Sequence, residues 1–389
     1  MGLPRVLVVH NRYRFEGGEE RSVELHVRAL AAAGVPHALL ERRSSDSSRA
    51  GAARALLSGG SRPDELAGAA RALGASVVHF HNTLPLVGPR GLARAREAGA
   101  GVVVHLHNLR LFCAIGVAAR DGGPCFRCHH RFTLPGLVLN CRGSLPEAAV
   151  YATALALHQP TVIDAVDSFV VPSRYAAGQV TKLGLPRERV EVLRHYLPAE
   201  AFAERSRAGE GTYALVVARL SPEKGVDTAI DAAALAGVPL RVAGEGPAAG
   251  ELAARIAARG APVELLGRLG REALRQELDG AAMLLMPSRY HEFAGYSALE
   301  AMAAGVPVVA SALGAPPEML GSERCVAPND PAGLAARMRE LWEQRELRAA
   351  EGELLVARAR AAHGEQSFTR ALLELYGRVA TAAGRRRAE

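Results

Sequence analysis

The stretch LLMPSRYHEFAGYSALEAMAAGVPVVAS, residues 284–311, decides the fold that this sequence predicts. It reads as a buried strand, a loop, a helix and a second buried strand, the alternation from which doubly wound parallel sheets are built. Glu292 falls in the loop, and Glu300 falls in the first turns of the helix predicted at residues 297–304. Both glutamates are therefore expected at the edge of a sheet where open α/β domains bind their ligands.

The start of that helix is a candidate binding end. A helix N-terminus presents unpaired backbone N–H groups and the positive end of the helix dipole, which suits a phosphate. A carboxylate one turn further along accepts hydrogen bonds from vicinal hydroxyls such as those of a ribose. Gly295, Tyr296 and Ser297 lie at this end and are expected to contact the same ligand as Glu300.

Chain length and a repeated alternation of strands and helices predict two such domains. A chain of 389 residues is too long for one ordinary hydrophobic core. The predicted strands are apolar runs at residues 5–10, 36–40, 77–81, 102–107, 168–171 and 190–193, and again at 213–218, 239–243, 263–266, 283–286 and 306–310. Residues 44–61 predict a mobile loop, and residues 198–211 predict the interdomain linker.

A second charged motif follows the strand predicted at residues 213–218. Arg219 and Lys224 are five positions apart in a short turn before a helix. Two cations on one turn suit an anionic ligand such as a diphosphate. An isolated pair with this spacing is usually solvated surface, but the two glutamates of residues 284–311 make a binding site the stronger interpretation.

These motifs resemble those of the family 4 retaining glycosyltransferases of the GT-B fold. The resemblance rests on the E-x7-E element, the run AMAAGVPVVA and the R-x4-K pair, and it extends over residues 6–376. It implies an α/β protein made of two Rossmann-like, doubly wound parallel-sheet domains facing a central cleft. The chain departs from the family at Phe293-Ala294-Gly295, where Phe-Gly is common, and at Ala218, where glycine is usual.

The resemblance also implies the domain borders. Residues 1–198 are expected to form the acceptor-side N-terminal domain, with a cysteine-rich insertion at residues 113–141. Residues 199–364 are expected to form the C-terminal domain, which binds the nucleotide sugar. Residues 365–389 are expected to form a helix that crosses back to the N-terminal domain and ends in a solvated basic tail.

Roles for individual residues follow from the same resemblance. Arg219 and Lys224 are expected on the diphosphate, and Glu300 on the ribose. Glu292 and His107 are expected on the transferred sugar, with Glu292 as an orienting group rather than a nucleophile. The expected catalytic residues are thus His107, Arg219, Lys224 and Glu292. Further substrate contacts are expected at the edges of the cleft, from Gly17, Gly18, His81, Asn108, Gly244, Gly246, Arg268, Leu269 and Glu318.

The glycine-rich turn at residues 244–250 does not fit a dinucleotide-binding motif. Its spacing is G-x-G-x-x-x-G, and Pro247 occupies the second half of the turn. A lone glycine motif is in any case a weak signal. We interpret it as a strand-to-helix turn that lines the nucleotide side of the cleft.

Two predicted strands end in pairs of histidines. His79 and His81 lie on one side of their strand, as do His105 and His107, because side chains alternate along a strand. A lone histidine near a strand end is more often a packed, hydrogen-bonded residue than a catalytic one. Here His81 and His107 both stand at carboxyl ends of strands, where the ligand crevice is expected.

Four cysteines fall in one short segment that has little apolar material on which to fold. Four thiolates close a tetrahedral structural zinc site, and a disulfide is disfavoured in a reducing cytoplasm. The alternative is a set of free thiols in an irregular insertion, and the sequence leaves both open. The candidate zinc ligands are Cys113, Cys125, Cys128 and Cys141.

The amino-acid composition argues against a nucleic-acid-binding protein and a membrane-spanning protein. The net charge of +7 comes almost entirely from arginine, because Lys182 and Lys224 are the only lysines. A nucleic-acid surface would need a stripe rich in lysine and aromatic residues, and only 5% of this chain is aromatic. The sequence shows neither a membrane-spanning run nor a secretion signal, so we expect a cytoplasmic protein, with peripheral contact with an acidic membrane surface compatible with its charge.

The sequence thus predicts an enzyme that moves a sugar from a UDP-, GDP- or other nucleotide-diphosphate sugar to an acceptor hydroxyl with retention. The expected setting is bacterial polysaccharide, glycolipid or other glycoconjugate biosynthesis, and no cofactor or metal is expected in catalysis. Two alternatives remain: a nucleotide-sugar epimerase on the same fold, and a non-catalytic nucleotide-sugar-binding protein. The base, the sugar and the acceptor depend on loop shapes that no motif fixes.

Overall fold

The computed structural model describes residues 3–13 and 17–388 of the chain. The chain divides into two compact units. Unit 1 comprises Met1–Ala118, Phe126–His195 and Gln366–Glu389, and unit 2 comprises Ala119–Cys125 and Tyr196–Glu365. The sequence-based borders fell after residues 198 and 364.

The sequence predicts that the whole cysteine-rich insertion, residues 113–141, lies in the N-terminal domain. In the structure the insertion is divided between the two units. Its strands β5 (Ala119–Arg120) and β6 (Gly123–Pro124) pair as a small antiparallel hairpin. That hairpin belongs to unit 2, where the Asn329 side-chain amide donates a hydrogen bond of 3.0 Å to the Gly122 carbonyl. The rest of the insertion, including the short helix α5 (Leu134–Val138), belongs to unit 1.

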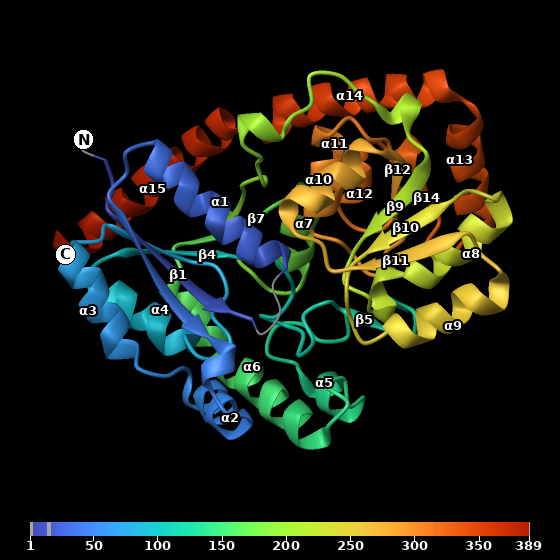
Figure 1. The fold of residues 1–389 in the computed structure, drawn as a ribbon. Coiled ribbons are helices and arrows are strands. Elements are labelled where there is room, and N and C mark those ends of the chain that lie inside the picture. The colour runs from blue at the N-terminus through green and yellow to red at the C-terminus, as the bar shows by residue number, and fades with distance from the viewer. Residues whose placement is uncertain (1–2, 14–16, 389) are drawn as a thin grey trace. The chain divides into compact units, whose positions relative to one another are not determined.

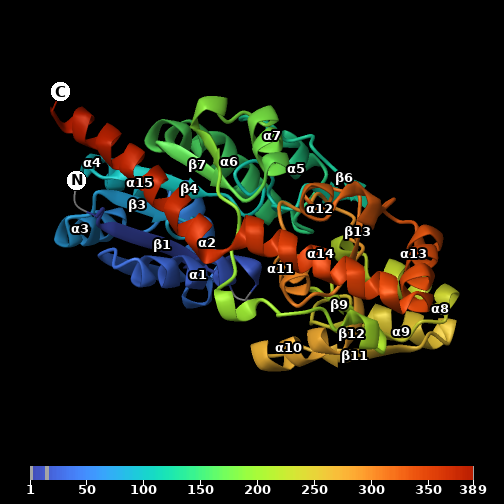
Figure 2. The same ribbon diagram turned by 90° about the horizontal axis from the view of Figure 1, so that it is seen from above.

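The core of unit 1 is a six-stranded parallel sheet built from short apolar runs. Its order is β2 (His37–Arg43), β1 (Val6–Arg12), β3 (Val77–Phe80), β4 (Gly101–His105), β7 (Ser168–Val171) and β8 (Val190–Val192). The four central strands are buried almost throughout, as parallel strands covered on both faces require. Figure 2 shows β1, β3, β4 and β7 in this order across unit 1.

Helices cover both faces of this sheet (Figure 1). One face carries α1 (Gly18–Ala32) and α15 (Glu365–Ala388), and the other carries α2 (Arg49–Ser58), α3 (Pro63–Leu73), α4 (Gly88–Glu97) and α6 (Leu145–Ala165). A further helix, α7 (Arg174–Lys182), connects β7 to β8. The N-terminal residues and the last helix of the chain therefore share one unit.

Two expectations for unit 1 are wrong. The predicted mobile loop at residues 44–61 contains α2, which starts where the Ser48 hydroxyl accepts from the Gly51 N–H at 3.1 Å and ends at Gly59 in the left-handed conformation. The basic tail is not simply solvated, because the Arg386 guanidinium contacts both Asp167 carboxylate oxygens at 2.6 and 3.0 Å. The same carboxylate accepts from the Val102 N–H at 2.8 Å, so the end of α15 is tied to β4.

Unit 2 contains a second six-stranded parallel sheet. Its order is β11 (Val263–Gly267), β10 (Leu240–Ala243), β9 (Tyr213–Val217), β12 (Ala281–Met286), β13 (Val308–Ser311) and β14 (Cys325–Val326). Relative to their order in the chain these strands run 3-2-1-4-5-6, the order of doubly wound nucleotide-binding domains. The switch point, where the connections leave in opposite directions, lies between β9 and β12.

A buried hydrophobic cluster of unit 2 joins this sheet to three helices. It contains apolar side chains of α8 (Val226–Ala236), α9 (Ala249–Arg259) and α13 (Pro331–Glu343). The remaining helices of unit 2 are α10 (Arg271–Asp279), α11 (Tyr296–Ala303), α12 (Pro316–Leu320) and α14 (Arg345–His363). Among the described residues, no helix is both long enough and apolar enough to span a membrane.

Candidate functional site

The two charged motifs of the sequence lie at the switch point of unit 2. The carboxyl end of β9 leads into the turn that carries Lys224, and the carboxyl end of β12 leads into the loop that carries Glu292. These are the neighbouring strands between which open α/β sheets bind ligands.

Lys224 and Glu292 contact one another directly. The Lys224 ammonium donates to Glu292 Oε1 at 2.8 Å and to the Tyr290 hydroxyl at 2.8 Å. The other carboxylate oxygen, Oε2, accepts from the Tyr290 hydroxyl at 2.5 Å, and Ser288 Oγ donates to Oε1 at 2.8 Å. Glu292 is 5% exposed, so its charge is held by three donors rather than by water.

Burial and the neighbouring carboxylate have opposite effects on the pKa of Lys224. Burial disfavours the charged ammonium, but the Glu292 carboxylate and the Tyr290 hydroxyl outweigh it and raise the pKa of Lys224. Burial and the same carboxylate also raise the pKa of Tyr290. At neutral pH the site therefore holds a lysine cation beside a neutral phenol.

The loop after β12 is fastened to the loop after β9 by more than this pair. The Arg289 N–H donates to the Glu223 carbonyl at 2.8 Å, and its guanidinium donates to Asp227 at 2.5 Å and to Thr228 Oγ1 at 3.0 Å. Both partners lie in the first turn of α8. The two switch-point loops therefore form one hydrogen-bonded assembly.

Glycines make the close approach of these loops sterically feasible. Gly225 has a φ of +65°, and a Cβ there would lie 2.0 Å from the Pro287 carbonyl oxygen. A Cβ on Gly244 would lie 1.8 Å from the Ala218 carbonyl oxygen, and one on Gly246 would lie 2.2 Å from that of Leu220. The glycine turn predicted to line the nucleotide side thus packs against the backbone on either side of Arg219.

The other predicted nucleotide contacts lie at the carboxyl edge of the same sheet or in the helices that follow it. Glu300 is in α11 and partly buried, and Gly295 precedes the first residue of that helix. Arg268 and Leu269 follow β11. Glu318 is in α12, where its carbonyl accepts from the Arg358 guanidinium at 2.9 Å. The contacts of these residues with a nucleotide stay predictions.

Unit 1 has a pocket at the carboxyl ends of β3 and β4. It encloses about 770 Å³ of space, part of it open to solvent, between these strand ends and α2, α4 and α6. Polar groups at one end include three residues of the predicted set, His81, His107 and Asn108, while leucine, proline and alanine side chains form much of the wall. Such a pocket suits a ligand with an apolar body and a few oxygen atoms.

Glu19 is a pocket residue that the sequence analysis did not identify. It stands at the start of α1, directly after the predicted Gly17 and Gly18, and the Asn108 side-chain amide donates to it at 3.5 Å. Burial raises the pKa of Glu19 to about 7, although Arg110 acts in the opposite direction. Glu19 therefore holds its proton up to a higher pH than an ordinary carboxyl group does.

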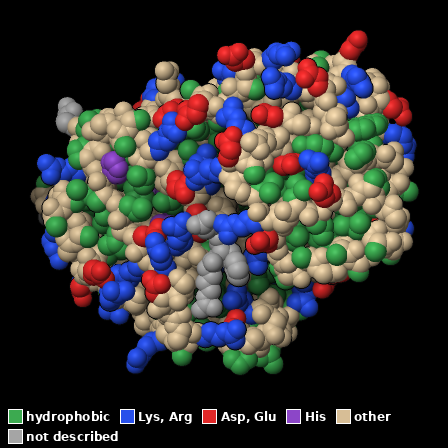
Figure 3. All heavy atoms as spheres, viewed as in Figure 1, with side chains coloured by type: hydrophobic (Ala, Val, Ile, Leu, Met, Phe, Trp, Pro, Cys, Tyr) green, Lys and Arg blue, Asp and Glu red, His purple; other side chains and the backbone are tan. Residues whose placement is uncertain are grey.

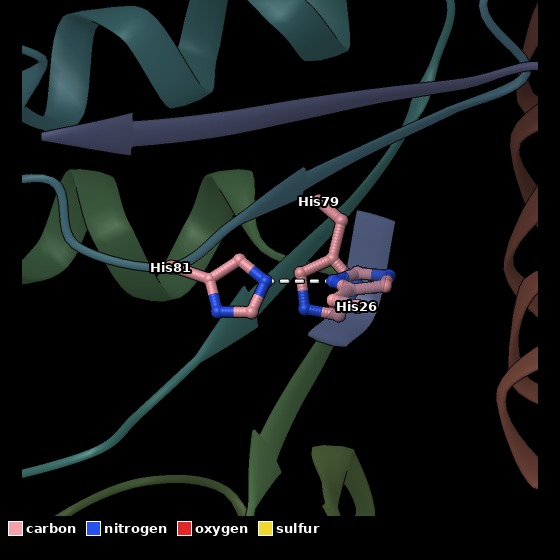
Figure 4. A group of neighbouring side chains, drawn as sticks. All are labelled: His26, His79 and His81. Carbon is pink, nitrogen blue, oxygen red and sulfur yellow. Dashed lines mark hydrogen bonds between the residues drawn. The ribbon is translucent and has the colours of Figure 1, made fainter. Parts of the chain in front are cut away.

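The histidines of β3 and β4 are part of a larger buried cluster. His79 and His81 stack with ring centroids 4.9 Å apart, and His105 and His107 stack at 4.3 Å, which confirms that each pair lies on one side of its strand. His26 of α1 packs against this stack (Figure 4). Little histidine colour reaches the face drawn in Figure 3, as expected for buried side chains.

The clustered imidazoles are neutral. Burial lowers the pKa of His26 to about 3, and burial together with the neighbouring rings holds the pKa of His79, His81, His105 and His107 well below the usual range. Burial also raises the pKa of Tyr376, which contacts two of these rings, well above its ordinary value. The cluster is therefore polar but uncharged.

Among the described residues, the groups of three potential metal ligands that lie close together consist of histidines. Ring nitrogens of His26, His79 and His81 lie within 4.8 Å of one another, as do those of His81, His105 and His107. No three of the four predicted cysteine ligands form such a group in the described chain. Cys125 belongs to unit 2, while Cys113, Cys128 and Cys141 belong to unit 1. The structural zinc site stays a prediction.

Sequence reasoning missed the groups that surround the identified side chains. Tyr290 and Ser288 were visible in the decisive stretch, next to Glu292, but their contacts depend on how the loop folds back. His26 and Tyr376 gave no local signal, because each sits inside an ordinary helical pattern and contacts His79 or His81 only in the folded unit.

Comparison with known proteins finds similarity to a protein family over most of unit 2. Residues 199–353 match the family model described as glycosyl transferases group 1. The D-inositol 3-phosphate glycosyltransferase of Mycolicibacterium smegmatis is 31% identical over 58% of this chain and 56% of its own length. The glycogen synthase of Mycobacterium tuberculosis is 34% identical over 48% of this chain and 50% of its own length. The chain thus spans about half the length of these curated relatives.

Solved structures extend the likeness to the whole chain. A sucrose-phosphate synthase from Thermosynechococcus elongatus is 16% identical, with a TM-score of 0.74 over 97% of this chain and all of its own. The Anabaena protein HepE in complex with UDP is 16% identical, with a TM-score of 0.65 over 96% of this chain and 99% of its own. Residues 199–353 therefore match the glycosyl transferases group 1, and the chain as a whole has the α/β GT-B fold of two Rossmann-like units.

Proposed function

We propose that this protein is a glycosyltransferase that moves a sugar from a nucleotide-diphosphate sugar to an acceptor hydroxyl with retention of anomeric configuration. The observation that carries the proposal is the Lys224–Glu292 contact of 2.8 Å at the switch point of unit 2. Both residues fall within the part of the chain that matches the glycosyltransferase family model. HepE, which shares this fold, is described in complexes with UDP and with UDP-glucose.

The donor diphosphate would bind beside Lys224 and Arg219. As the glycosidic bond breaks, negative charge builds up on the leaving phosphate, and a cation already fixed in place stabilises that charge without reorganising. Tyr290 and Glu292 both accept from the Lys224 ammonium, so protein groups already orient it. The bound diphosphate would gain a partner without the cost of ordering a long side chain.

Glu292 is suited to orient a sugar rather than to attack it. Its carboxylate accepts from Lys224, Ser288 and Tyr290, and these three donors occupy lone pairs that an attacking oxygen would need. A double displacement would need a carboxylate free to attack the anomeric carbon. Retention would then follow from attack on the face that the diphosphate leaves, with the leaving phosphate taking the acceptor proton.

The experiment combines donor binding with product analysis. Thermal stabilisation by UDP, GDP and ADP, and by their sugars, identifies the base, because a ligand that binds only the native state raises its stability. Nucleotide release that depends on an added acceptor, with an unchanged anomeric configuration by NMR, supports transfer. A changed nucleotide sugar without acceptor would instead indicate an epimerase. Binding without turnover of any nucleotide sugar, across a broad acceptor panel, would contradict the enzyme assignment.

The two glutamates provide an internal check. Glu300 is proposed to hold the ribose, which does not change in the reaction, so Glu300→Ala should mainly raise KM and weaken binding of free nucleotide diphosphate. Glu292→Gln keeps the size of the side chain but removes the charge that faces the sugar and Lys224, so it should mainly lower kcat. Equal loss of nucleotide affinity in both variants would refute this placement of the donor.

A further inference from the structure

A continuous run of hydrogen-bonding contacts crosses unit 1 and ends at the pocket. The Tyr376 hydroxyl lies 2.8 Å from His79 Nδ1 and 2.6 Å from His26 Nε2. His26 Nδ1 lies 2.7 Å from His81 Nε2, the contact drawn in Figure 4, and His81 Nδ1 lies 2.9 Å from His107 Nε2. We call these five residues the histidine chain.

The number of hydrogens in the histidine chain is fixed. Its first four members are at most 3% exposed, and His107 is partly buried at the rim of the pocket. Each neutral imidazole carries one N–H and one lone pair, and the phenol carries one O–H. His79 Nε2 is buried and has no hydrogen-bond partner among the described residues.

Only three arrangements of these hydrogens put one hydrogen in every contact. In the first, His107 donates toward His81 and the run ends with the N–H of His79 Nε2 unpaired. In the second, both His26 and His79 donate to the tyrosine oxygen, and the phenol O–H has no acceptor within the histidine chain. In the third, His79 donates to Tyr376, which donates to His26, which donates to His81, which donates to His107.

The third arrangement is the most stable of the three. It is the only one in which Tyr376, His79, His26 and His81, the four most buried members, all donate their hydrogens within the histidine chain. The buried group that it leaves without a partner is a lone pair on His79 Nε2. A buried donor without an acceptor costs about 1–3 kcal/mol and is rarer in proteins than an under-used acceptor. The third arrangement therefore fixes the direction of all four hydrogen bonds.

We infer that the histidine chain fixes the ring proton of His107 on Nδ1, so that His107 is a hydrogen-bond donor toward a ligand oxygen in the pocket. His107 Nε2 is occupied by the hydrogen from His81, which leaves Nδ1 as the only other ring nitrogen. His81 is then a positioning residue for His107. The consequence for catalysis rests on the proposed function, whereas the position of the proton does not.

This assignment restricts the chemistry of His107. Its only lone pair accepts from His81, so the ring is not available as a general base. An N–H recognises a hydroxyl, carboxylate or phosphate oxygen through its lone pairs. His107 therefore selects an oxygen at this point of the pocket.

The direct test is nitrogen NMR of the full chain labelled with ¹⁵N-histidine, because protonated and unprotonated ring nitrogens have well-separated shifts. The expected result is an N–H at Nδ1 of both His107 and His81. His37, which is not part of the histidine chain, serves as a control for the assignment. A wild-type His107 that carries its proton on Nε2 overturns the proposal, whether or not the protein transfers sugar.

A matched pair of variants tests whether His81 is the cause. The amide nitrogen of asparagine reaches about the place of Nδ1, so His81→Asn should keep the donor to His107 and leave its proton on Nδ1. His81→Leu removes that donor and should shift the His107 proton toward Nε2. A His107 proton that stays on Nδ1 in the leucine variant would show that His81 does not position it.

Kinetics supply the functional readout. His107→Asn keeps a donor near the position of Nδ1, whereas His107→Gln moves it to about the position of Nε2. We expect kcat to be about ten-fold higher in the asparagine variant than in the glutamine variant, the scale of one buried hydrogen bond. The reverse order would overturn the role assigned to Nδ1.

Metal content completes the test, because ring nitrogens of His26, His79 and His81 lie within 4.8 Å of one another. Protein purified without a histidine tag is analysed for zinc beside His79→Phe and Cys125→Ser variants. Absence of stoichiometric metal is expected at the histidine chain. One equivalent of zinc that is lost in His79→Phe and kept in Cys125→Ser would show a metal bound to these histidines. That metal would take the place of the His26–His81 hydrogen bond, and the proposed proton arrangement would be wrong.

Discussion

At the scale of single residues, Lys224 differs from nearly all the other basic residues of the protein in its side-chain type and in its contacts. It is one of two lysines in a chain that otherwise uses arginine, and it is the one that reaches a buried carboxylate. An ammonium is a compact charge on a flexible stem, whereas a guanidinium is a wide planar fork. The Lys224 ammonium contacts both the Tyr290 hydroxyl and Glu292 Oε1 at 2.8 Å, as a compact charge can.

Replacement of Lys224 should therefore affect turnover more than binding. We expect Lys224→Ala to lower kcat by about 10²–10³-fold, or about 2.7–4 kcal/mol of barrier, because the lost charge faces the leaving group. Affinity for the uncharged nucleoside should change little. The exposed Lys182, replaced by alanine, is the matched control. Wild-type turnover in the Lys224 variant would disprove the assignment.

Glu19 predicts a dependence of stability on pH. Its pKa is about 7 in the folded protein, above the ordinary value of 4.5, so the folded state holds the proton more tightly than the unfolded state. Wild-type stability should therefore fall as the pH rises from about 4.5 through 7. Glu19→Gln avoids this loss, and its advantage in unfolding free energy should grow over that interval and then level off.

Denaturant unfolding at several pH values measures this effect. Glu24→Gln, on the same helix but at an exposed carboxylate, is the control for an ordinary charge change. An advantage of Glu19→Gln that stays constant between pH 4.5 and 8 would contradict the burial of its carboxylate.

Sequence reasoning reached those site residues whose signal is local. Lys224 and Glu292 each stand a few positions after an apolar strand, and the sheet order then brings the two loops together. Tyr376 could not be found in this way. It lies 297 positions from His79, which it contacts, and its own neighbours describe only an amphipathic helix.

At the scale of elements, the strands were the most predictable part. Each central strand is a short apolar run, and burial on both faces allows little else. Helix α2 was missed because its alanine, glycine and serine residues were interpreted as a loop. The helix depends instead on its end contacts and on packing against α6, which sequence periodicity does not report.

Helix α8 carries a prediction at its two ends. Gly225 precedes it with a φ of +65°, and Gly237 follows it with a φ of +68°. A Cβ at position 225 would collide with the Pro287 carbonyl, whereas one at position 237 meets nothing within 4 Å. Gly225→Ala should therefore displace the turn that carries Lys224 and reduce nucleotide diphosphate affinity.

Gly237→Ala is the control, because it carries the same backbone strain without the collision. It should lower the unfolding free energy by only about 1–2 kcal/mol and leave nucleotide affinity unchanged. Isothermal titration with the preferred nucleotide diphosphate and thermal unfolding separate the two effects. Equal affinity in both alanine variants would mean that the collision at position 225 is absorbed without moving Lys224.

At the scale of the whole molecule, the last helix is a structural part of unit 1. Leu372 and Tyr376 of α15 are fully buried, and Arg386 is ion-paired to Asp167. Leu372→Ala should lower the stability of unit 1 by about 2–5 kcal/mol, the usual cost of such a cavity. Arg386→Ala should cost at most about 1 kcal/mol, because the pair is partly exposed.

Hydrogen exchange shows which strands are destabilised by the Leu372→Ala substitution. In Leu372→Ala, protection should fall in β1 and β3 of unit 1 and remain in β9 and β12 of unit 2. Loss of protection that is uniform over both sheets would show that the two units unfold as a single body.

The division of the chain also has a consequence for protein synthesis. Most of unit 1 is synthesised before unit 2, yet unit 1 also takes residues 366–389, which follow unit 2 in the chain. Translation adds about 5–20 residues per second, so the early strands wait for seconds while unit 2 is made from one nearly unbroken stretch. During that wait His26 and His79 lack the tyrosine oxygen that links them. Of the two units, the one whose synthesis starts first is therefore the one that is completed last.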